Sequence, residues 1–253
     1  MAERLDKFLV GQNLGSRKEV SGMVRRGLVT VNGTAARDAA MKIDPEQDTV
    51  TVGGRPVVYR RVVTIMMNKP AGVLSATEDR RQPTVLDLLP EELRRRGLFP
   101  AGRLDKDTTG LLLITDDGDL AHRMLAPKSH VYKQYEARTA RPVTAEDIAA
   151  FAAGVEQGGQ AFAPARLWTE EGPDGPVACV EIREGKFHQV KRMFQAVGNQ
   201  VLALRRRKIG GLALDETLAP GACRLCTEEE IASIFLDDLS KKSPENLDFI
   251  ESD

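Results

Sequence analysis

The sequence of 253 residues is short of aromatic residues, cysteine and histidine, and it has no long hydrophobic run. Aromatic residues make up 5%, and the longest nearly continuous apolar stretch, residues 62–67, is interrupted by Thr64. A membrane span needs about 20 apolar residues, so a soluble protein without a membrane partner is predicted. The opening M-A-E-R-L-D-K mixes acids and bases, which predicts no secretory signal and a cytoplasmic location.

The few cysteines and histidines give no sign of a disulfide framework or a metal site. Three cysteines are an odd number, which fits a reducing compartment. Cys223 and Cys226 form a single C-x-x-C, and no second pair or histidine stands at zinc-finger spacing. We therefore prefer two ordinary buried thiols over a zinc or redox site, and no metal is predicted. The histidines are scattered without a shared ligand spacing: His122, His130 and His188.

The near-neutral net charge of -1 is the average of a basic body and an acidic tail. From Thr227 to the end there are 9 acids and 2 bases, whereas residues 1–226 carry a net +6. Bases are concentrated in the run from Arg205 to Lys208, with Lys186, Lys191 and Arg192 shortly before it. This clustering favours a polyanionic partner over an evenly solvated surface.

Residues 1–59 are predicted to form a small N-terminal domain. Ser16 is a predicted N-cap for a short helix that ends at Gly27, and residues 28–31 and 49–52 are predicted strands. The helix carries a set of basic residues on its polar side: Arg17, Lys18, Arg25 and Arg26.

Residues 60–236 are predicted to form a second, mixed α+β domain, and the acidic residues 237–253 a disordered tail. Because strands and crossover helices do not alternate regularly, we expect a largely antiparallel sheet. Predicted strands are residues 63–68, 111–115, 135–139 and 177–183, the last after a loop at 171–176, and predicted helices are 118–125, 144–154, 188–197 and 228–236. Asp116, Asp117 and Asp119 lack the remaining ligands of a calcium loop, so an Asp-Gly hairpin turn is preferred there.

The most informative segment is F-P-A-G-R-L-D-K-D-T-T-G-L-L-L-I-T, residues 99–115. It places Arg103 and Asp105 on a loop that leads into an apolar strand, and loops braced by a rigid scaffold often carry reactive groups. By itself, Asp105 would more often be a turn-forming aspartate. Asp105 and Asp107 are two residues apart on one loop, which is not evidence for a glycosidase pair.

The N-terminal pattern R-L-D-K-F-L, then S-R-K-E-V and a strand ending V-N-G, resembles the alpha-L RNA-binding module of ribosomal protein S-four. Four further stretches carry a second resemblance together with G-R-L-D-K-D-T-T-G: M-N-K-P-A-G-V-L-S-A-T, K-Q-Y-E, E-G-K-F-H-Q-V-K-R-M-F and I-G-G-L-A-L-D-E-T-L-A-P-G. In this order they resemble the pseudouridine synthases, specifically the family that modifies small-subunit (16S) ribosomal RNA, in which an alpha-L module precedes the catalytic domain.

The resemblance implies an isomerase that needs no cofactor and acts, as a monomer, on ribosomal RNA or an assembling small-subunit particle. It implies that Asp105 is the catalytic residue, acting either as a nucleophile on the sugar or as a base, and that Lys191 is the cation that keeps it ionised. Tyr135 would stack on the target base, and Arg103 would help to hold the nucleotide outside the RNA helix. Leu204 and Arg206 match a segment that closes the pocket floor, although the surrounding basic run could also bind phosphates.

Two other functions are compatible with the same motifs. A non-catalytic RNA-binding factor for ribosome assembly would use the same basic surface, but it would not need Asp105, Tyr135 and Lys191 together. A synthase that acts on large-subunit RNA would share the catalytic motifs, because the choice of uridine depends on RNA shape and context. The amino-acid sequence of the C-terminal segment, G-G-L-A-L-D-E-T-L-A-P-G followed by T-E-E-E-I, resembles the small-subunit group more than the large-subunit group.

Overall fold

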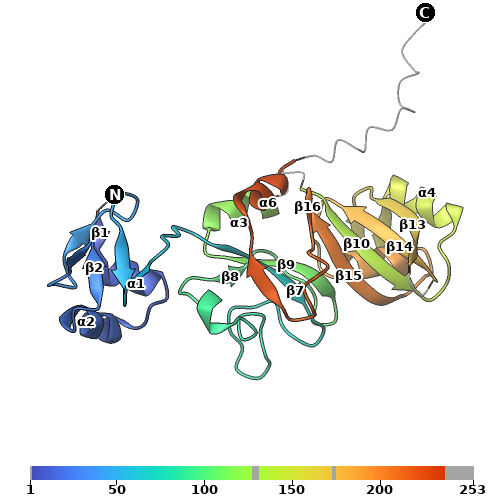
Figure 1. Ribbon diagram of the computed structural model, residues 1–253. Helices are drawn as coiled ribbons and strands as arrows, with labels where there is room; N and C mark the ends of the chain where they lie inside the picture. Colours follow the sequence, from blue (N-terminus) through green and yellow to red (C-terminus); the bar gives the residue numbers. More distant parts are fainter. Residues whose placement is uncertain (1, 127–130, 173–174, 237–253) are drawn as a thin grey trace, which may run out of the picture.

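The computed structural model describes residues 2–126, 131–172 and 175–236. A small N-terminal module is joined to a larger domain by residues 57–63, which form no helix or strand (Figure 1). The acidic tail predicted at residues 237–253 lies outside the described residues. Among the described helices, none has both the length and the apolar composition for crossing a membrane.

The N-terminal module packs two helices against short strands around its own hydrophobic core. Its larger sheet has the order β3-β2-β5-β6, and β1 pairs with β4. Leu5, Phe8 and Val20 are fully or almost fully buried in this core. The elements are β1 (Glu3–Arg4), α1 (Leu5–Gly11), α2 (Arg17–Arg25), β2 (Val29–Val31), β3 (Thr34–Ala35), β4 (Lys42–Ile43), β5 (Val50–Val52) and β6 (Arg55–Pro56).

Helix α2 begins at the predicted N-cap. The Ser16 hydroxyl accepts a hydrogen bond from the Glu19 amide at 3.3 Å, and the Glu19 carboxylate accepts one from the Ser16 amide at 2.7 Å. This reciprocal pair satisfies two amides that the start of a helix would otherwise leave without partners. The prediction of a capped helix at Ser16 is therefore confirmed.

The larger domain is built on one sheet with the strand order β13-β14-β10-β15-β9-β7-β17. Among the described strands, every neighbouring pair is antiparallel except β15 and β9, which confirms the predicted sheet type. The strands, with β8 and β16 at the margins, are β7 (Thr64–Lys69), β8 (Phe99–Pro100), β9 (Thr109–Thr115), β10 (Lys133–Thr139), β13 (Arg166–Gly172), β14 (Gly175–Ile182), β15 (Val201–Ile209), β16 (Leu212–Ala213) and β17 (Cys223–Leu225).

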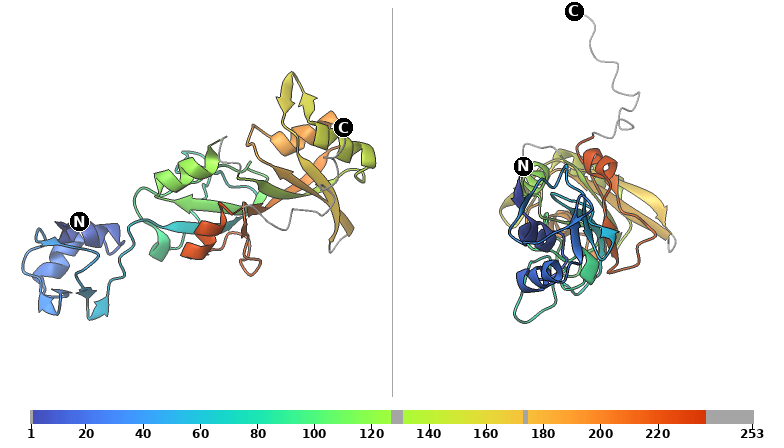
Figure 2. Two further views of the ribbon diagram at one scale, coloured as in Figure 1. Left: turned by 90° about the horizontal axis from the view of Figure 1, so that it is seen from above. Right: turned by 60° about the vertical axis from the view of Figure 1, so that its left-hand side comes forward.

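Helices and loops cover both faces of this sheet (Figures 1 and 2). The additional elements are the 3-10 helix η1 (Glu91–Leu93), α3 (Gly118–Leu125), α4 (Ala145–Ala153), the hairpin of β11 (Val155–Gln157) and β12 (Gln160–Phe162), α5 (Gln189–Ala196) and α6 (Glu228–Ser233). Strand β9 is buried on both faces: Leu111 and Leu113 share a core with Met124 of α3, whereas Leu112 and Ile114 belong to the other core. Double burial explains why this strand is a continuous apolar run.

The structure departs from the predicted elements at several places. The helix predicted over 228–236 is too long, because α6 ends at Ser233. The expected hairpin turn at Asp117 is wrong, because this side chain accepts a hydrogen bond from the Leu120 amide at 2.9 Å and caps α3. The predicted loop at residues 171–176 is too long, since β13 extends to Gly172 and β14 begins at Gly175. Strand β15 was not predicted, because its four consecutive basic residues hide the alternation typical of a strand.

Gly110 lets β9 approach β15 closely at their parallel contact. Its φ is +96°, and a Cβ atom there would lie 2.3 Å from the Arg206 carbonyl oxygen. Replacing Gly110 by Ala is expected to lower the free energy of unfolding by about 2 kcal/mol or more, through the clash and the strained backbone. Urea unfolding measures this. The control Gly118→Ala, which meets nothing within 4 Å, should change stability by less than about 0.5 kcal/mol. Equal stability of both variants would contradict the expectation.

Candidate active site

The loop that carries Asp105 lies between β8 and β9, and a buried ammonium group holds it in place. Lys69, at the end of β7, is fully buried. Its Nζ donates hydrogen bonds to the carbonyl oxygens of Asp105 (3.2 Å), Lys106 (3.3 Å) and Thr108 (3.0 Å), and to that of Pro70 (3.0 Å). Burial lowers the pKa of Lys69 to about 8, against the raising effect of Asp107 and Asp105. The lysine acts as a clamp on the backbone that presents Asp105.

A second contact fixes the residue before Asp105. The Ser75 hydroxyl donates a hydrogen bond to the Leu104 carbonyl oxygen at 2.9 Å and accepts one from the Leu104 amide at 3.1 Å. Leu104 is itself buried in the core. The loop is thus tied to β7 on one side and to the segment after β7 on the other.

The Asp105 carboxylate points to helix α5 and is partly exposed. Its Oδ2 lies 3.0 Å from Nζ of Lys191, and 27% of the Asp105 side chain is accessible to solvent. The same ammonium lies 2.6 Å from Oδ1 of Asp107, whose side chain is 74% exposed. Burial acts to lower the pKa of Lys191, but its hydrogen bonds to Asp107 and Asp105 outweigh this and the net shift is upward. Lys191 is therefore held as a cation between two carboxylates.

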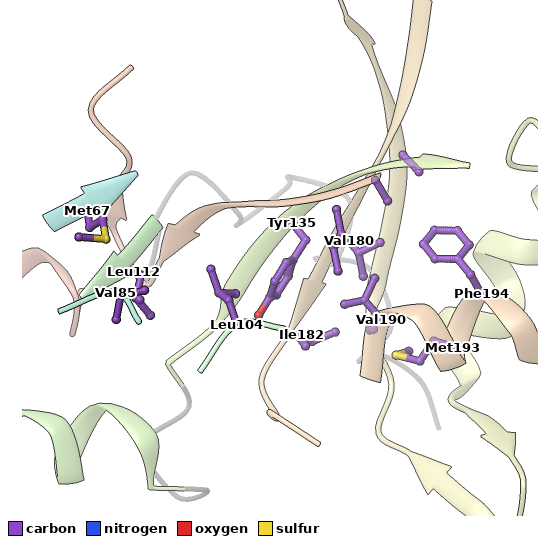
Figure 3. Close-up of a cluster of buried hydrophobic side chains, with 14 of the residues drawn as sticks. Met67, Val85, Leu104, Leu112, Tyr135, Val180, Ile182, Val190, Met193 and Phe194 are labelled. Carbon is purple, nitrogen blue, oxygen red and sulfur yellow. The ribbon is translucent and has the colours of Figure 1, made fainter. Parts of the chain in front are cut away.

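Tyr135 faces the same loop from strand β10. Its ring lies between Leu104 and Ile182 and is 8% exposed (Figure 3). On the neighbouring strand β15, the guanidinium carbon of Arg206 lies 6.0 Å from the ring centroid. Strand pairing places Tyr135 directly opposite Arg206, so the position of the ring depends on the sheet and not on a flexible loop.

A cavity of about 70 Å³ brings five of the twelve predicted site residues together. Its lining includes Arg103, Asp105, Tyr135, Lys186 and Leu204. Lys191 joins this group through its contact with Asp105. The cavity offers a carboxylate beside apolar side chains and the ring of Tyr135.

Three predicted RNA-binding residues have side-chain partners within the protein. Nζ of Lys186 donates a hydrogen bond to the Ala161 carbonyl oxygen at 2.9 Å and lies 3.0 Å from Oε1 of Glu184. Arg206 is 4% exposed, and its Nε donates a hydrogen bond to the Leu111 carbonyl oxygen at 2.8 Å, so its guanidinium group lies inside the protein and does not reach a surface phosphate. Arg192 donates to the Gln157 carbonyl oxygen at 2.6 Å and to the Gln160 side chain, which directs it to the β11–β12 hairpin.

The four predicted RNA-binding residues of the N-terminal module remain exposed on or beside α2: Arg17, Lys18, Arg25 and Arg26. Lys18, Arg25 and Arg26 line a groove that also includes Glu91 of the larger domain. At this junction the Asn13 side chain donates a hydrogen bond to the Glu91 carbonyl oxygen at 2.7 Å. These bases thus form a surface separate from the Asp105 cavity.

Three groups near Asp105 were not expected from the sequence. Lys69 lies in an apolar strand, so its role as a clamp has no local signal. Asp107 was considered only as a partner for a glycosidase pair, whereas it shares Lys191. His188 was considered only as a metal ligand, and its Nε2 lies 3.5 Å from Oδ1 of Asp105. Within the described residues, no group of three or more His, Cys, Asp or Glu side chains is placed to hold a metal ion.

The geometry of the cavity suits chemistry by an ionised carboxylate. Asp105 is accessible from the cavity, and Nζ of Lys191 lies 3.0 Å from its Oδ2. Such a group can attack an electrophilic carbon or accept a proton. Tyr135 supplies a flat apolar surface in the same cavity for a planar ligand.

Comparison with known families matches two regions of the chain. The family model for RNA pseudouridylate synthase matches residues 63–196, and the model for the S4 domain matches residues 3–50. The first region contains Asp105, Tyr135 and Lys191, and the second contains all of α2.

Individual relatives cover nearly the whole chain. An RNA pseudouridine synthase of Bacillus subtilis (strain 168), described as uncharacterized, is 50% identical over 230 residues, which cover 90% of this chain and 96% of the relative. Ribosomal small subunit pseudouridine synthase A of Escherichia coli (strain K12) is 44% identical over 242 residues, covering 91% and 99%. A solved structure described as a pseudouridylate synthase superposes with a TM-score of 0.62 at 36% identity, covering 91% and 99%.

Replacing Lys69 by Met tests the clamp on the loop. The change removes a buried donor shared by four carbonyl oxygens, and only those of Asp105 and Lys106 keep a backbone donor in its place, so the free energy of unfolding is expected to fall by about 2–4 kcal/mol. Urea unfolding measures this loss. Lys42→Met, at an exposed site on β4, is the control and should stay within about 0.5 kcal/mol of the parent protein. A loss for Lys69→Met no larger than that of the control would show that the clamp is dispensable.

Proposed function

The chain belongs to the RNA pseudouridylate synthase family, and we propose that it converts a specific uridine of small-subunit (16S) ribosomal RNA to pseudouridine through Asp105. The single observation that carries the assignment of Asp105 is its place in the cavity, 3.0 Å from Lys191 and beside Tyr135. The small-subunit target rests on relatives named ribosomal small subunit pseudouridine synthase A.

The proposed reaction moves one glycosidic bond within the same nucleotide. The bond from uracil N1 to ribose C1′ breaks, the base turns while it stays in the cavity, and a new bond forms between C5 and C1′. The C5 proton is then lost, and N1 gains one. Asp105 either adds to C1′ or removes a proton from the sugar, and both routes need its ionised form.

In this scheme the remaining residues hold the base and the carboxylate. Lys191 keeps Asp105 charged, and Asp107 holds Lys191 in place from its other side. Tyr135 stacks on the uracil, with Leu204 and Arg206 supporting the floor. A uracil stacked in a duplex cannot reach Asp105, so the nucleotide must be extruded; Arg103, exposed at the cavity, occupies the space that it leaves.

We place RNA binding on two surfaces of a single cytoplasmic chain acting as a monomer. The bases of α2 contact phosphates through the N-terminal module, residues 1–59, and Lys186 contributes at the rim of the catalytic cavity in residues 60–236. The monomer is sufficient because Asp105, Tyr135 and Lys191 come from one chain. A ribosomal RNA target supports the cytoplasmic location of the protein.

The alternative function, a non-catalytic RNA-binding assembly factor, is tested by the Asp105→Asn variant. This variant is expected to lose isomerisation completely while its affinity for RNA stays within about twofold, because the amide keeps the shape but not the charge. Tritium release from RNA labelled at uracil C5 measures the reaction, and filter binding measures affinity. Asp119→Asn, at an exposed site on α3, should remain fully active. Full activity of Asp105→Asn would reject the assignment.

Comparison of ribosomal RNA from cells with and without the gene identifies the substrate. We expect one pseudouridine to disappear from the small-subunit RNA and to return with the parent gene but not with Asp105→Asn. Loss of a pseudouridine from large-subunit RNA would instead support the alternative target. An unchanged pattern in both RNAs would contradict the proposed activity.

The contribution of α2 is expected to appear in the salt dependence of RNA binding. Each phosphate contact releases counterions, so removing Arg25 and Arg26 together should reduce the slope of log K against log salt by about 1.4–1.8. The matched control is Arg166→Ala, on the edge strand β13, which should leave the slope unchanged. If the double replacement leaves the slope unchanged, Arg25 and Arg26 do not contact RNA phosphates.

A further inference from the structure

Phe187 is exposed to an unusual degree for an aromatic residue beside a catalytic cavity. Its relative exposure is 69%, the highest among the large hydrophobic residues exposed in the described part of the chain. A single exposed apolar side chain is common and needs no explanation alone. The neighbours of Phe187 give this one a specific setting.

The Phe187 ring is held in a stack with His188. The ring centroids are 3.7 Å apart and the planes are inclined by 19°. His188 has a left-handed backbone with φ +50°, a conformation that is uncommon outside glycine, and it stands at the N-cap of α5. Such backbone outliers occur preferentially at functional sites. One face of Phe187 is therefore covered by His188, and its large exposure leaves the other face open.

The stacked pair adjoins Asp105. Nε2 of His188 lies 3.5 Å from Oδ1 of Asp105, and His188 lines the cavity together with Tyr135. Lys186, which precedes Phe187, lines the same cavity, and its ammonium group is paired with Glu184 at 3.0 Å. Phe187 thus stands between two residues, Lys186 and His188, that line the cavity that would receive the target base.

We propose that Phe187 stacks on the base of a nucleotide adjacent to the target uridine in the RNA strand. The proposal rests on the proposed function, because a uridine extruded into the cavity leaves its neighbour without a stacking partner. An aromatic ring that is already supported by His188 replaces that partner with little loss of side-chain freedom. Stacking on an aromatic ring tolerates any base, so Phe187 contributes affinity without selecting a sequence.

The test measures RNA binding in the Asp105→Asn background, where chemistry does not intervene. The probe is a 16S RNA fragment that contains the unmodified target uridine. With this fragment, Phe187→Ala is expected to raise Kd about tenfold, and Phe187→Trp to keep it within about threefold. Ile148→Ala, at an exposed apolar site on α4, is the matched control and should leave Kd unchanged. Equal Kd values for Phe187→Ala and the parent would overturn the proposal.

Abasic RNA identifies the stacked nucleotide. When the base on one side of the target is removed, the penalty for Phe187→Ala should shrink to less than about twofold, because the partner of the ring is gone. A tenfold penalty that persists with either neighbour abasic would also overturn the proposal. Failure of the proposed function is distinguishable, since the parent protein would then form no pseudouridine in the intact fragment.

Discussion

The ion pair between Asp105 and Lys191 is the contact on which the site depends. It joins a loop before β9 to a helix 86 residues later in the chain, and it brings an ammonium group to 3.0 Å from the Asp105 carboxylate. Coulomb attraction falls with distance and with solvent access, so the pair is effective only if both backbones are held. The buried Lys69 clamp and the Ser75 contacts hold the loop, and the burial of Met193 and Phe194 holds α5. The sheet beneath them sets the distance.

The residues around the cavity come from two kinds of structure, paired strands and loops. Strands β10 and β15 carry Tyr135 and Arg206, whose positions are fixed by backbone pairing, whereas Asp105, Phe187 and His188 lie on loops at the edge of this support. A rigid floor with reactive groups on braced loops suits a ligand that must turn while it stays bound. The N-terminal module is separate from the cavity, and the exposed bases of α2 lie on a surface that does not include Asp105.

The charged side chains of this site interact as a group, because single residues contact more than one partner of opposite charge. Lys191 contacts two carboxylates, Asp105 also has His188 nearby, and Lys69 carries positive charge beneath the same loop. The hydrogen bond from Lys191 lowers the pKa of Asp107, so this second acid contributes a fixed negative charge on the solvent side. The cation is therefore held from both sides and cannot swing away from Asp105 without losing a partner.

The sequence alone determined the capped helix at Ser16, most helices, six of the described strands, and the family, because caps, periodicity and ordered motifs are local or linear signals. It also named Asp105, Tyr135 and Lys191 as a set, and their catalytic roles stay predictions. Only the tertiary structure decided that Lys69 clamps the loop, that Asp107 shares Lys191, that Arg206 lies inside the protein and that Phe187 stands open on His188. These facts depend on distances between segments far apart in the chain, and such distances are set by packing that no local pattern records.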